Sequence, residues 1–282
     1  MVKLLSYQYQ SAASFGVLQS NGIIDLKNQA HFLQNTLLDV LRDRTLQEIA
    51  QSIAGLQATI QLSDVVLDVP LPNAPRIFCI GRNYKGHLAE INAKLPEQPS
   101  LFFRTMASMV ACNQPLIRPQ ASTDFDYEGE LALVIGKPAK NVSIEHAMQH
   151  IMAYTIVNDG SIRDYQFKHS LTVGKNFEKS GSMGPWITTV DEVGDPSQLE
   201  ITTTLNGVQV QHSGTDDLIF DIPTIVHYIS SFTTLMTGDI IATGTPDGVG
   251  FTRTPPLWLK QQDVLEISIS RLGTLRHTVI NE

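Results

Sequence analysis

The part of the chain after residue 70 consists mainly of short segments patterned as β-strands. Seven of them are rich in Val, Ile, Leu and Thr and are bounded by turn residues: RIFCIG, ELALVIG, AYTIVND, EITTTLNG, DIIATG, VLEISIS and TLRHTVI. Helical patterns occur only near residues 144–152 and 222–231. This pattern predicts a β-rich structure for residues 71–282.

The first 70 residues have a different organisation. GVLQSNGIIDL predicts two short strands around an Asn21-Gly22 turn. Thr45 and Glu48 have the spacing of a capping box before an apolar helical stripe. The prolines of DVPLPNAPR suit an extended linker. We therefore predict a small N-terminal α/β domain over residues 1–70, followed by a second domain over residues 71–282.

Composition excludes several classes of partner. The chain has 28 acidic and 20 basic residues and no cluster of Lys and Arg, which argues against nucleic-acid binding. No apolar run is long enough for a signal peptide or a membrane span, so we expect a cytoplasmic protein without a membrane partner. Cys79 and Cys112 lie in apolar contexts and are predicted to be buried, reduced thiols.

In the segment DYEGELALVI, Glu128 and Glu130 lie on one face of an apolar strand. Glu128 and Glu130 are about 7 Å apart along such a strand. Burying them without partners would cost several kcal/mol each, so they should be neutralised, protonated or bound to a cation. Asp159, at the end of the apolar strand AYTIVND, would complete a set of hard oxygen ligands, which favours Mg²⁺ or Mn²⁺. From spacing alone, Glu128 and Glu130 could equally line a polar strand face.

A second pair of residues has the spacing of an acid–base pair. His87 and Glu90 in HLAE are three positions apart and share one face of a helix. Such a pair can take a proton from water or substrate. The same spacing is common on ordinary surface helices, and this alternative stays open on these residues alone.

Together, fragments spread over residues 75–280 resemble the fumarylacetoacetate hydrolase family, in its shorter branch similar to acylpyruvases and 2-hydroxyhepta-2,4-diene-1,7-dioate isomerases. The fragments are GRNYKGHLAE, LFFR, DYEGELALVIGK, YTIVNDGSIRDYQ, GKNF, LNGVQVQ, TLMTGDIIATGTPDGVG and GTLRHTV. The resemblance implies an α+β, β-rich fold with a mixed β-barrel or roll. It also implies a homodimer and a bound Mg²⁺ or Mn²⁺, with Ca²⁺ as a substitute.

The resemblance also implies roles for individual residues. Glu128, Glu130 and Asp159 match the metal ligands. His87 and Glu90 match a catalytic dyad on a segment that closes as a lid, residues 85–97, and Lys175 of GKNF matches a lysine beside the metal. Gln166 and Thr245 match contacts with the substrate, and Arg163 matches an arginine that is either structural or a contact with the substrate. Arg82 is expected as an additional contact with the substrate. Two positions depart from the pattern, because Ser170 stands where longer relatives have an aromatic residue, and Arg104 stands where many have Lys. Arg104 is expected to alter the mouth of the pocket.

The implied activity is hydrolysis of a C–C bond in a 2,4-dioxo acid such as an acylpyruvate or fumarylpyruvate, through a metal-stabilised enolate and a water activated by the His87–Glu90 dyad. The same site is compatible with decarboxylation or tautomerisation of oxaloacetate, and with isomerisation or hydration of a 2-oxo acid. A non-catalytic module that binds a carboxylated ligand is the remaining alternative.

Overall fold

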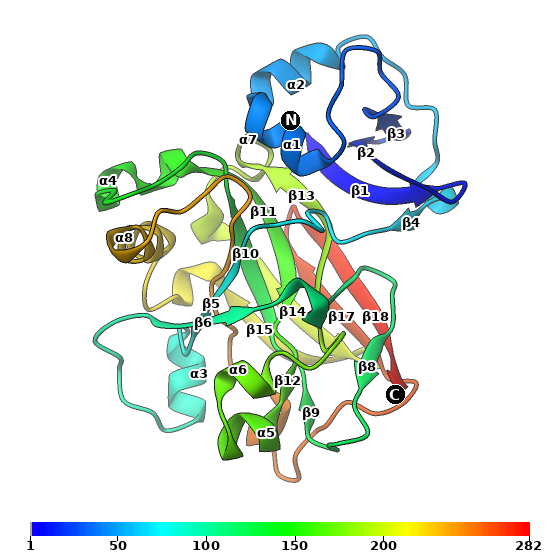
Figure 1. The fold of residues 1–282 in the computed structure, drawn as a ribbon. Coiled ribbons are helices and arrows are strands. Elements are labelled where there is room, and N and C mark those ends of the chain that lie inside the picture. Colours follow the sequence, from blue (N-terminus) through cyan, green and yellow to red (C-terminus); the bar gives the residue numbers. More distant parts are fainter. Residues whose placement is uncertain (1) are drawn as a thin grey trace.

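A mixed sheet of eleven strands forms the centre of the molecule (Figure 1). The structure is a computed structural model that describes residues 2–282. The strand order is β3-β2-β1-β13-β11-β10-β16-β5-β6, with β4 beside β1 and β7 beside β13. The strands are β1 (Lys3–Tyr9), β2 (Ala12–Gln19), β3 (Gly22–Asp25), β4 (Val66–Leu67), β5 (Ile77–Gly81), β6 (Ser100–Arg104), β7 (Met109–Ala111), β10 (Gly129–Ile135), β11 (Ile151–Asn158), β13 (Gly181–Thr189) and β16 (Ile240–Ala242).

A second sheet of five strands packs against the first, in the order β15-β14-β17-β18-β8. Its strands are β8 (Leu116–Arg118), β14 (Glu200–Leu205), β15 (Val208–Gly214), β17 (Val264–Ile269) and β18 (Gly273–Asn281), and a separate ladder joins β9 (Phe125–Asp126) to β12 (Ser161–Ile162). Both sheet orders have free ends. The predicted β-rich α+β fold is therefore confirmed as a roll, without closure into a barrel.

Strand β10 separates two hydrophobic cores. Leu131, Leu133 and Ile135 belong to the core shared with the five-stranded sheet, whereas Ala132 and Val134 belong to the core that the N-terminal helices cover. All seven residues of β10 are buried, which explains why the sequence of this strand is apolar on both faces. In β17, by contrast, buried and half-buried residues alternate, because only one face of the outer sheet is covered.

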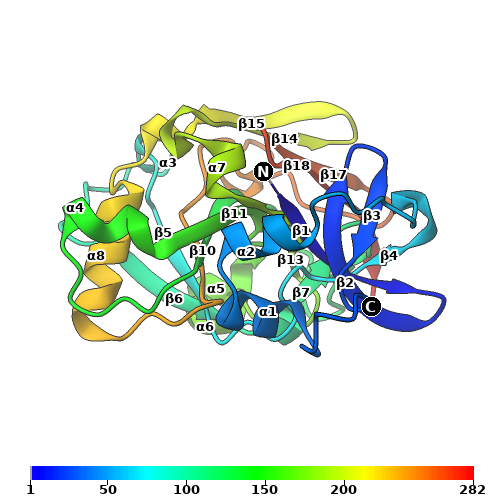
Figure 2. The same ribbon diagram turned by 90° about the horizontal axis from the view of Figure 1, so that it is seen from above.

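The helices are short and lie around the sheets (Figure 2). They are α1 (Leu37–Asp43), α2 (Leu46–Ser52), α3 (Lys85–Glu90), α4 (Ile144–Ala147), α5 (Arg163–Lys168), α6 (Leu171–Gly174), α7 (Val190–Val193) and α8 (Ile222–Phe232). The helix predicted near 222–231 is confirmed as α8. The helix predicted near 144–152 is present as α4 followed by a 3-10 turn over Met148–His150, and it ends there because Ile151 already pairs with Ile135 in the sheet. Within residues 2–282, no helix has the length and hydropathy needed to cross a membrane.

The N-terminal region adds strands to the large sheet. The predicted hairpin is present as β2 and β3, where Gly22 adopts φ +133°, and the capping box of Thr45 and Glu48 is formed. Strand β1 pairs with β13, so residues before and after position 70 share one sheet. The division of the chain at residue 70 stays a prediction. Cys79 and Cys112 are free and buried, as expected.

We predict that Leu4→Ala destabilises the whole protein in a single unfolding transition. Leu4 is fully buried and pairs with Ile187 of β13. Truncating such a side chain typically costs about 2 to 5 kcal/mol. The matched control is Leu33→Ala, whose side chain is 87% exposed. Urea unfolding followed by Trp fluorescence measures both variants, and a separate early transition confined to the N-terminal region would contradict the prediction.

Candidate active site

Three carboxylates converge where β10 and β11 run side by side. Gly129 pairs with Asn158, which places Asp159 next to Glu128, and the Asp159 N–H donates to the Glu128 carbonyl oxygen at 2.8 Å. Glu130 lies two residues along β10 on the same face. One carboxylate oxygen from each of Glu128, Glu130 and Asp159 lies within 4.8 Å of the other two. The predicted convergence of the three side chains is thus present in the structure.

Two of the three carboxylates are neutralised by buried cations. Lys175 Nζ donates to Glu128 Oε2 at 2.7 Å and to Asp159 Oδ2 at 2.6 Å. Arg163 forms an ion pair with Glu128 at 2.6 Å, and Arg104 donates to Asp159 at 2.7 Å. Burial acts to raise the pKa of Glu128, but the charges of Lys175 and Arg163 outweigh it and hold this pKa at about 2.

Glu130 is the exception within this cluster. Its side chain accepts a hydrogen bond from the Gly244 N–H at 2.9 Å, and within residues 2–282 it forms no ion pair with a Lys, Arg or His. Burial, together with the negative charges of Asp159 and Glu128, raises the pKa of Glu130 well above its ordinary value. A divalent cation among three hard oxygen donors would supply the missing positive charge. The residues present therefore fit a divalent metal ion.

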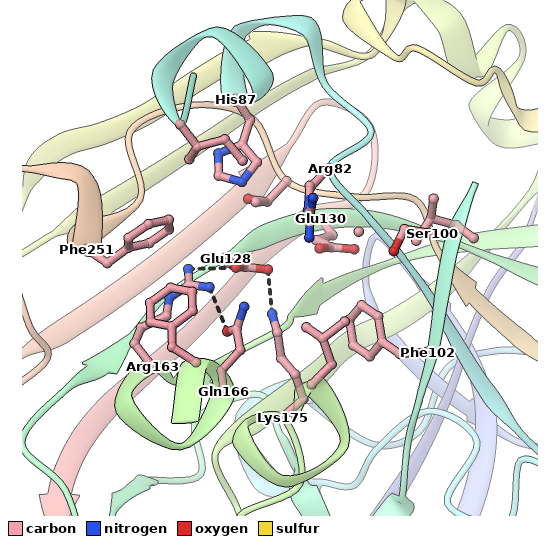
Figure 3. Close-up of a pocket in the computed structure, with 16 residues that line it drawn as sticks. Arg82, His87, Ser100, Phe102, Glu128, Glu130, Arg163, Gln166, Lys175 and Phe251 are labelled. Atoms are coloured by element: carbon pink, nitrogen blue, oxygen red, sulfur yellow. Dashed lines mark hydrogen bonds and ion pairs between the residues drawn. The ribbon is translucent and has the colours of Figure 1, made fainter. Parts of the chain in front are cut away.

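His87 projects from α3 into the cavity above the carboxylates (Figure 3). Its Nδ1 lies 3.1 Å from Glu90 Oε2, so the two residues that the resemblance pairs as a dyad are in contact. The other ring nitrogen, Nε2, remains for a ligand in the cavity. Burial acts to raise the pKa of Glu90, but hydrogen bonds from His87, Thr252 and Gly248 outweigh burial and lower it. The Glu90 carboxylate fixes the orientation of the imidazole ring.

The cavity has a volume of about 360 Å³ and combines a charged floor with an apolar wall. Glu128, Glu130 and Lys175 form part of the floor, and Phe102 and Phe251 belong to the wall (Figure 3). Such a volume is at the lower end of the range for ligand sites. The cavity therefore suits a small, charged organic molecule.

Arg163 and Gln166, both predicted to contact a substrate, line the cavity from α5. Arg163 Nη1 donates to Gln166 Oε1 at 3.0 Å, which leaves the amide NH₂ of Gln166 turned toward the cavity (Figure 3). Arg163 also forms ion pairs with Asp126 and Glu128. Its guanidinium lies 4.4 Å from the centre of the Phe251 ring. Arg163 therefore supports the site, and Gln166 offers free donors.

Arg82 and Thr245 also line the cavity, with different freedom to bind a ligand. Arg82 is exposed at the rim and has φ +56°, an uncommon backbone conformation outside glycine that often marks functional sites. The Thr245 hydroxyl donates to the Gly129 carbonyl oxygen at 3.0 Å and accepts from Gln211 at 2.8 Å. Arg82 can therefore offer positive charge to a ligand, whereas the hydroxyl proton of Thr245 is already in use.

The structure corrects one expectation and adds one residue. Arg104 does not lie at the mouth of the pocket, because it is 3% exposed and binds Asp159 and Ser180 behind the carboxylates. Sequence reasoning missed Asp126, a fully buried carboxylate that accepts from Arg163 Nε at 2.8 Å. The alternation of acidic residues in DFDYEGE was the available signal for it. Ser170, which replaces an aromatic residue, caps α6 by accepting from the Val173 N–H.

Residues 76–280 match the family described as fumarylacetoacetate (FAA) hydrolase C-terminal. The chain belongs to this family. It is 35% identical to the mitochondrial oxaloacetate tautomerase of Xenopus laevis, over 99% of this chain and 90% of that protein. Among solved structures, a fumarylacetoacetate hydrolase from Exiguobacterium antarcticum superposes with a TM-score of 0.84 at 31% identity, and each chain is covered completely.

A third relative has a metal in its structure. The maleylpyruvate hydrolase from Sphingobium sp. SYK-6, solved in complex with manganese(II) and pyruvate, has a TM-score of 0.82 and 26% identity, with 99% of each chain covered. Divalent-metal binding therefore occurs in the family. In this chain, the buried group of Glu128, Glu130 and Asp159 offers such an ion a site.

We predict that Glu130→Gln weakens Mn²⁺ binding by at least about 100-fold, because losing even an outer supporting residue of a metal site typically costs 10- to 100-fold. Electron paramagnetic resonance of free Mn²⁺ during a titration measures the affinity. Glu145→Gln, the same change at an exposed position on α4, is the control and should bind Mn²⁺ like the wild type. Equal affinity in both variants would exclude Glu130 as a ligand.

In the metal-free protein we predict that Glu130→Gln raises stability with a defined pH dependence. The pKa of Glu130 is higher in the folded protein than in the unfolded chain. The folded wild type is therefore most stable below the ordinary pKa of a glutamate, and it loses this stability as the pH rises toward the pKa that Glu130 has in the folded protein. In the presence of a chelator, the advantage of Glu130→Gln over the wild type should therefore be larger at pH 8 than at pH 5. Thermal unfolding measures it. Added Mn²⁺ should reverse the order of the two proteins at pH 8, and an unchanged order would count against a metal at this site.

Proposed function

We propose that this protein is a divalent-metal-dependent enzyme that moves a proton on a small 2-oxo acid, with keto–enol tautomerisation of oxaloacetate as its main reaction. The observation that carries this proposal is the position of His87, held by Glu90 above three buried carboxylates in a cavity of about 360 Å³. The similarity to oxaloacetate tautomerases over 99% of the chain supports it.

The charges of the cavity suit a dicarboxylate. A Mg²⁺ or Mn²⁺ ion at Glu128, Glu130 and Asp159 would act as a Lewis acid toward negative charge that develops on the 2-oxo oxygen. Lys175 adds a buried ammonium group on the cavity floor. Arg82, at the rim, can bind a second carboxylate by charge-assisted hydrogen bonds.

The reaction needs one group that removes a proton from carbon and returns it to oxygen. His87 Nε2 takes a proton from C3 of the keto acid, and the electron pair of that C–H bond forms the C2–C3 double bond. The former carbonyl oxygen then receives a proton from His87 to give the enol. Glu90 stabilises the imidazolium in between, and the low-dielectric cavity strengthens this interaction.

Hydrolysis of a C–C bond in an acylpyruvate is the second candidate. The same His87–Glu90 pair could deprotonate a water that attacks the C4 ketone, after which the C3–C4 bond breaks and C3 is protonated. Oxaloacetate has a carboxylate in place of that ketone and cannot react in this way. The structural similarity to a maleylpyruvate hydrolase favours keeping this candidate. Cytoplasmic location and a homodimer remain predictions.

We predict that His87→Gln lowers the tautomerisation rate by about 10²- to 10⁴-fold, the typical contribution of a general base. Mn²⁺ binding should be unchanged, because His87 is not a proposed ligand. The ultraviolet absorbance of the enol follows the reaction, and acylpyruvate hydrolysis is assayed in parallel. His146→Gln, the same change at an exposed position, is the control.

Each outcome of this assay has a clear meaning. If the wild type hydrolyses acylpyruvate rapidly and tautomerises oxaloacetate slowly, C–C bond hydrolysis is the main reaction. Intact substrates after long incubation with Mg²⁺ would indicate a binding module. Wild-type rates in His87→Gln would remove His87 from the catalytic role.

A further inference from the structure

The second oxygen of Glu90 is held by a loop that lies far away in the sequence. Glu90 Oε2 faces His87, whereas Glu90 Oε1 accepts from the Gly248 N–H at 2.9 Å and from the Thr252 hydroxyl at 2.7 Å. These two donors are the contacts by which residues 248–252 hold the carboxylate of the dyad. Of the described residues in this loop, Phe251 lines the cavity, whereas Thr252 does not.

Contacts with residues other than Glu90 also hold the loop of residues 248–252 in place. Asp126 accepts from the Gly250 N–H at 2.7 Å and from the Phe251 N–H at 3.1 Å. Arg253 donates to the Gly248 carbonyl oxygen at 3.1 Å. Gly248 has φ +96°, and a Cβ there would collide with the carbonyl oxygen of Val210, so the backbone is confined to one path. The positions of the Gly248 N–H and the Thr252 hydroxyl are therefore set by contacts that do not involve Glu90.

Asp126 also connects this loop to the carboxylate cluster. Its Oδ2 accepts from Arg163 Nε at 2.8 Å, and Arg163 forms the ion pair with Glu128. One buried carboxylate thus fixes both the loop that holds Glu90 and the arginine beside a proposed metal ligand. The spacing between the dyad and the cluster is set by this connection.

The Thr252 hydroxyl has one proton and two acceptors within reach. Besides Glu90 Oε1 at 2.7 Å, it lies 2.8 Å from the carbonyl oxygen of Val249. When Glu90 moves away, the proton can turn to Val249, so the hydroxyl is paired in either position. The cost of opening the contact is therefore the loss of a hydrogen bond to the charged Glu90 carboxylate, and not an unpaired Thr252 hydroxyl.

We propose that Thr252 is a positioning residue that, with the Gly248 N–H, latches Glu90 and so holds α3 with His87 above the carboxylates. Thr252 acts only through Glu90 and does not touch the substrate. The effect on turnover rests on the proposed function, whereas the effect on α3 does not.

The first test measures α3 directly by hydrogen–deuterium exchange of residues 84–93 in the metal-loaded protein. Thr252→Val should speed exchange of the amides of Leu88 and Ile91 by about tenfold or more, because a hydrogen bond to a charged group shifts an equilibrium by at least that factor. Thr252→Ser keeps the hydroxyl and should restore wild-type exchange. Thr278→Val, the same change at an exposed position on β18, should have no effect.

A double mutant separates latching from a general loss of stability. In a Glu90→Ala background, adding Thr252→Val should change the exchange of α3 no further, because the partner is already gone. A further increase in this background, or wild-type exchange in Thr252→Val itself, would overturn the proposal. If Thr252→Val does not fold, Thr252→Ala takes its place against Thr252→Ser.

The second test measures oxaloacetate tautomerisation. Thr252→Val should lower kcat by about tenfold and leave KM within about twofold of the wild type, because Thr252 lies outside the cavity. An unchanged kcat, or an effect confined to KM, would refute the positioning role. If the wild type turns over no 2-oxo acid, the proposed function fails. The exchange measurement still tests whether Thr252 holds α3 through Glu90.

Discussion

Placing three carboxylates inside an apolar sheet is the constraint on which the rest of this structure depends. One oxygen from each of Glu128, Glu130 and Asp159 lies within 4.8 Å of the others, and all three side chains are buried. Like charges at this distance repel strongly in a medium of low dielectric constant. Lys175 and Arg104 supply compensating charge from separate segments of the chain. Glu130 is left without a cationic side chain as a partner among the described residues, so the cluster offers a site to a divalent cation.

The same constraint explains how the proposed catalytic groups are arranged. Arg163, which neutralises Glu128, is itself held by Asp126, and Asp126 organises the loop that reaches Glu90. The charged floor of the cavity and the dyad above it are thus parts of one hydrogen-bonded network. Networks of this kind are strong when every member is satisfied and costly when one is removed. The loop of residues 248–252 is therefore part of the network that holds Glu90.

Local patterns in the sequence predicted the strands and brought Glu128, Glu130 and the His87–Glu90 pair forward as candidates, whereas the roles of the site residues came from the resemblance to the family. The two faces of β10 and the spacing of His87 and Glu90 depend on strand and helix periods, which are properties of adjacent residues. The burial of Arg104 could not be predicted in this way, because it depends on Asp159 and Ser180, which are 55 and 76 positions away. The end of the helical segment at His150 likewise follows from the pairing of Ile151 with Ile135. Tertiary contacts of this kind override local preference.

Anomalous diffraction from crystals grown with Mn²⁺ and oxalate is the most direct test that the carboxylate cluster is a metal centre. The account predicts one strong peak at about 2.1 Å from an oxygen of each of Glu128, Glu130 and Asp159, with the oxalate oxygens completing the coordination. It also predicts that the cluster remains the site when Mg²⁺ replaces Mn²⁺ at equal concentration. A structure in which Lys175 alone bridges Glu128 and Asp159 at saturating Mn²⁺, with no peak between the three carboxylates, would contradict it.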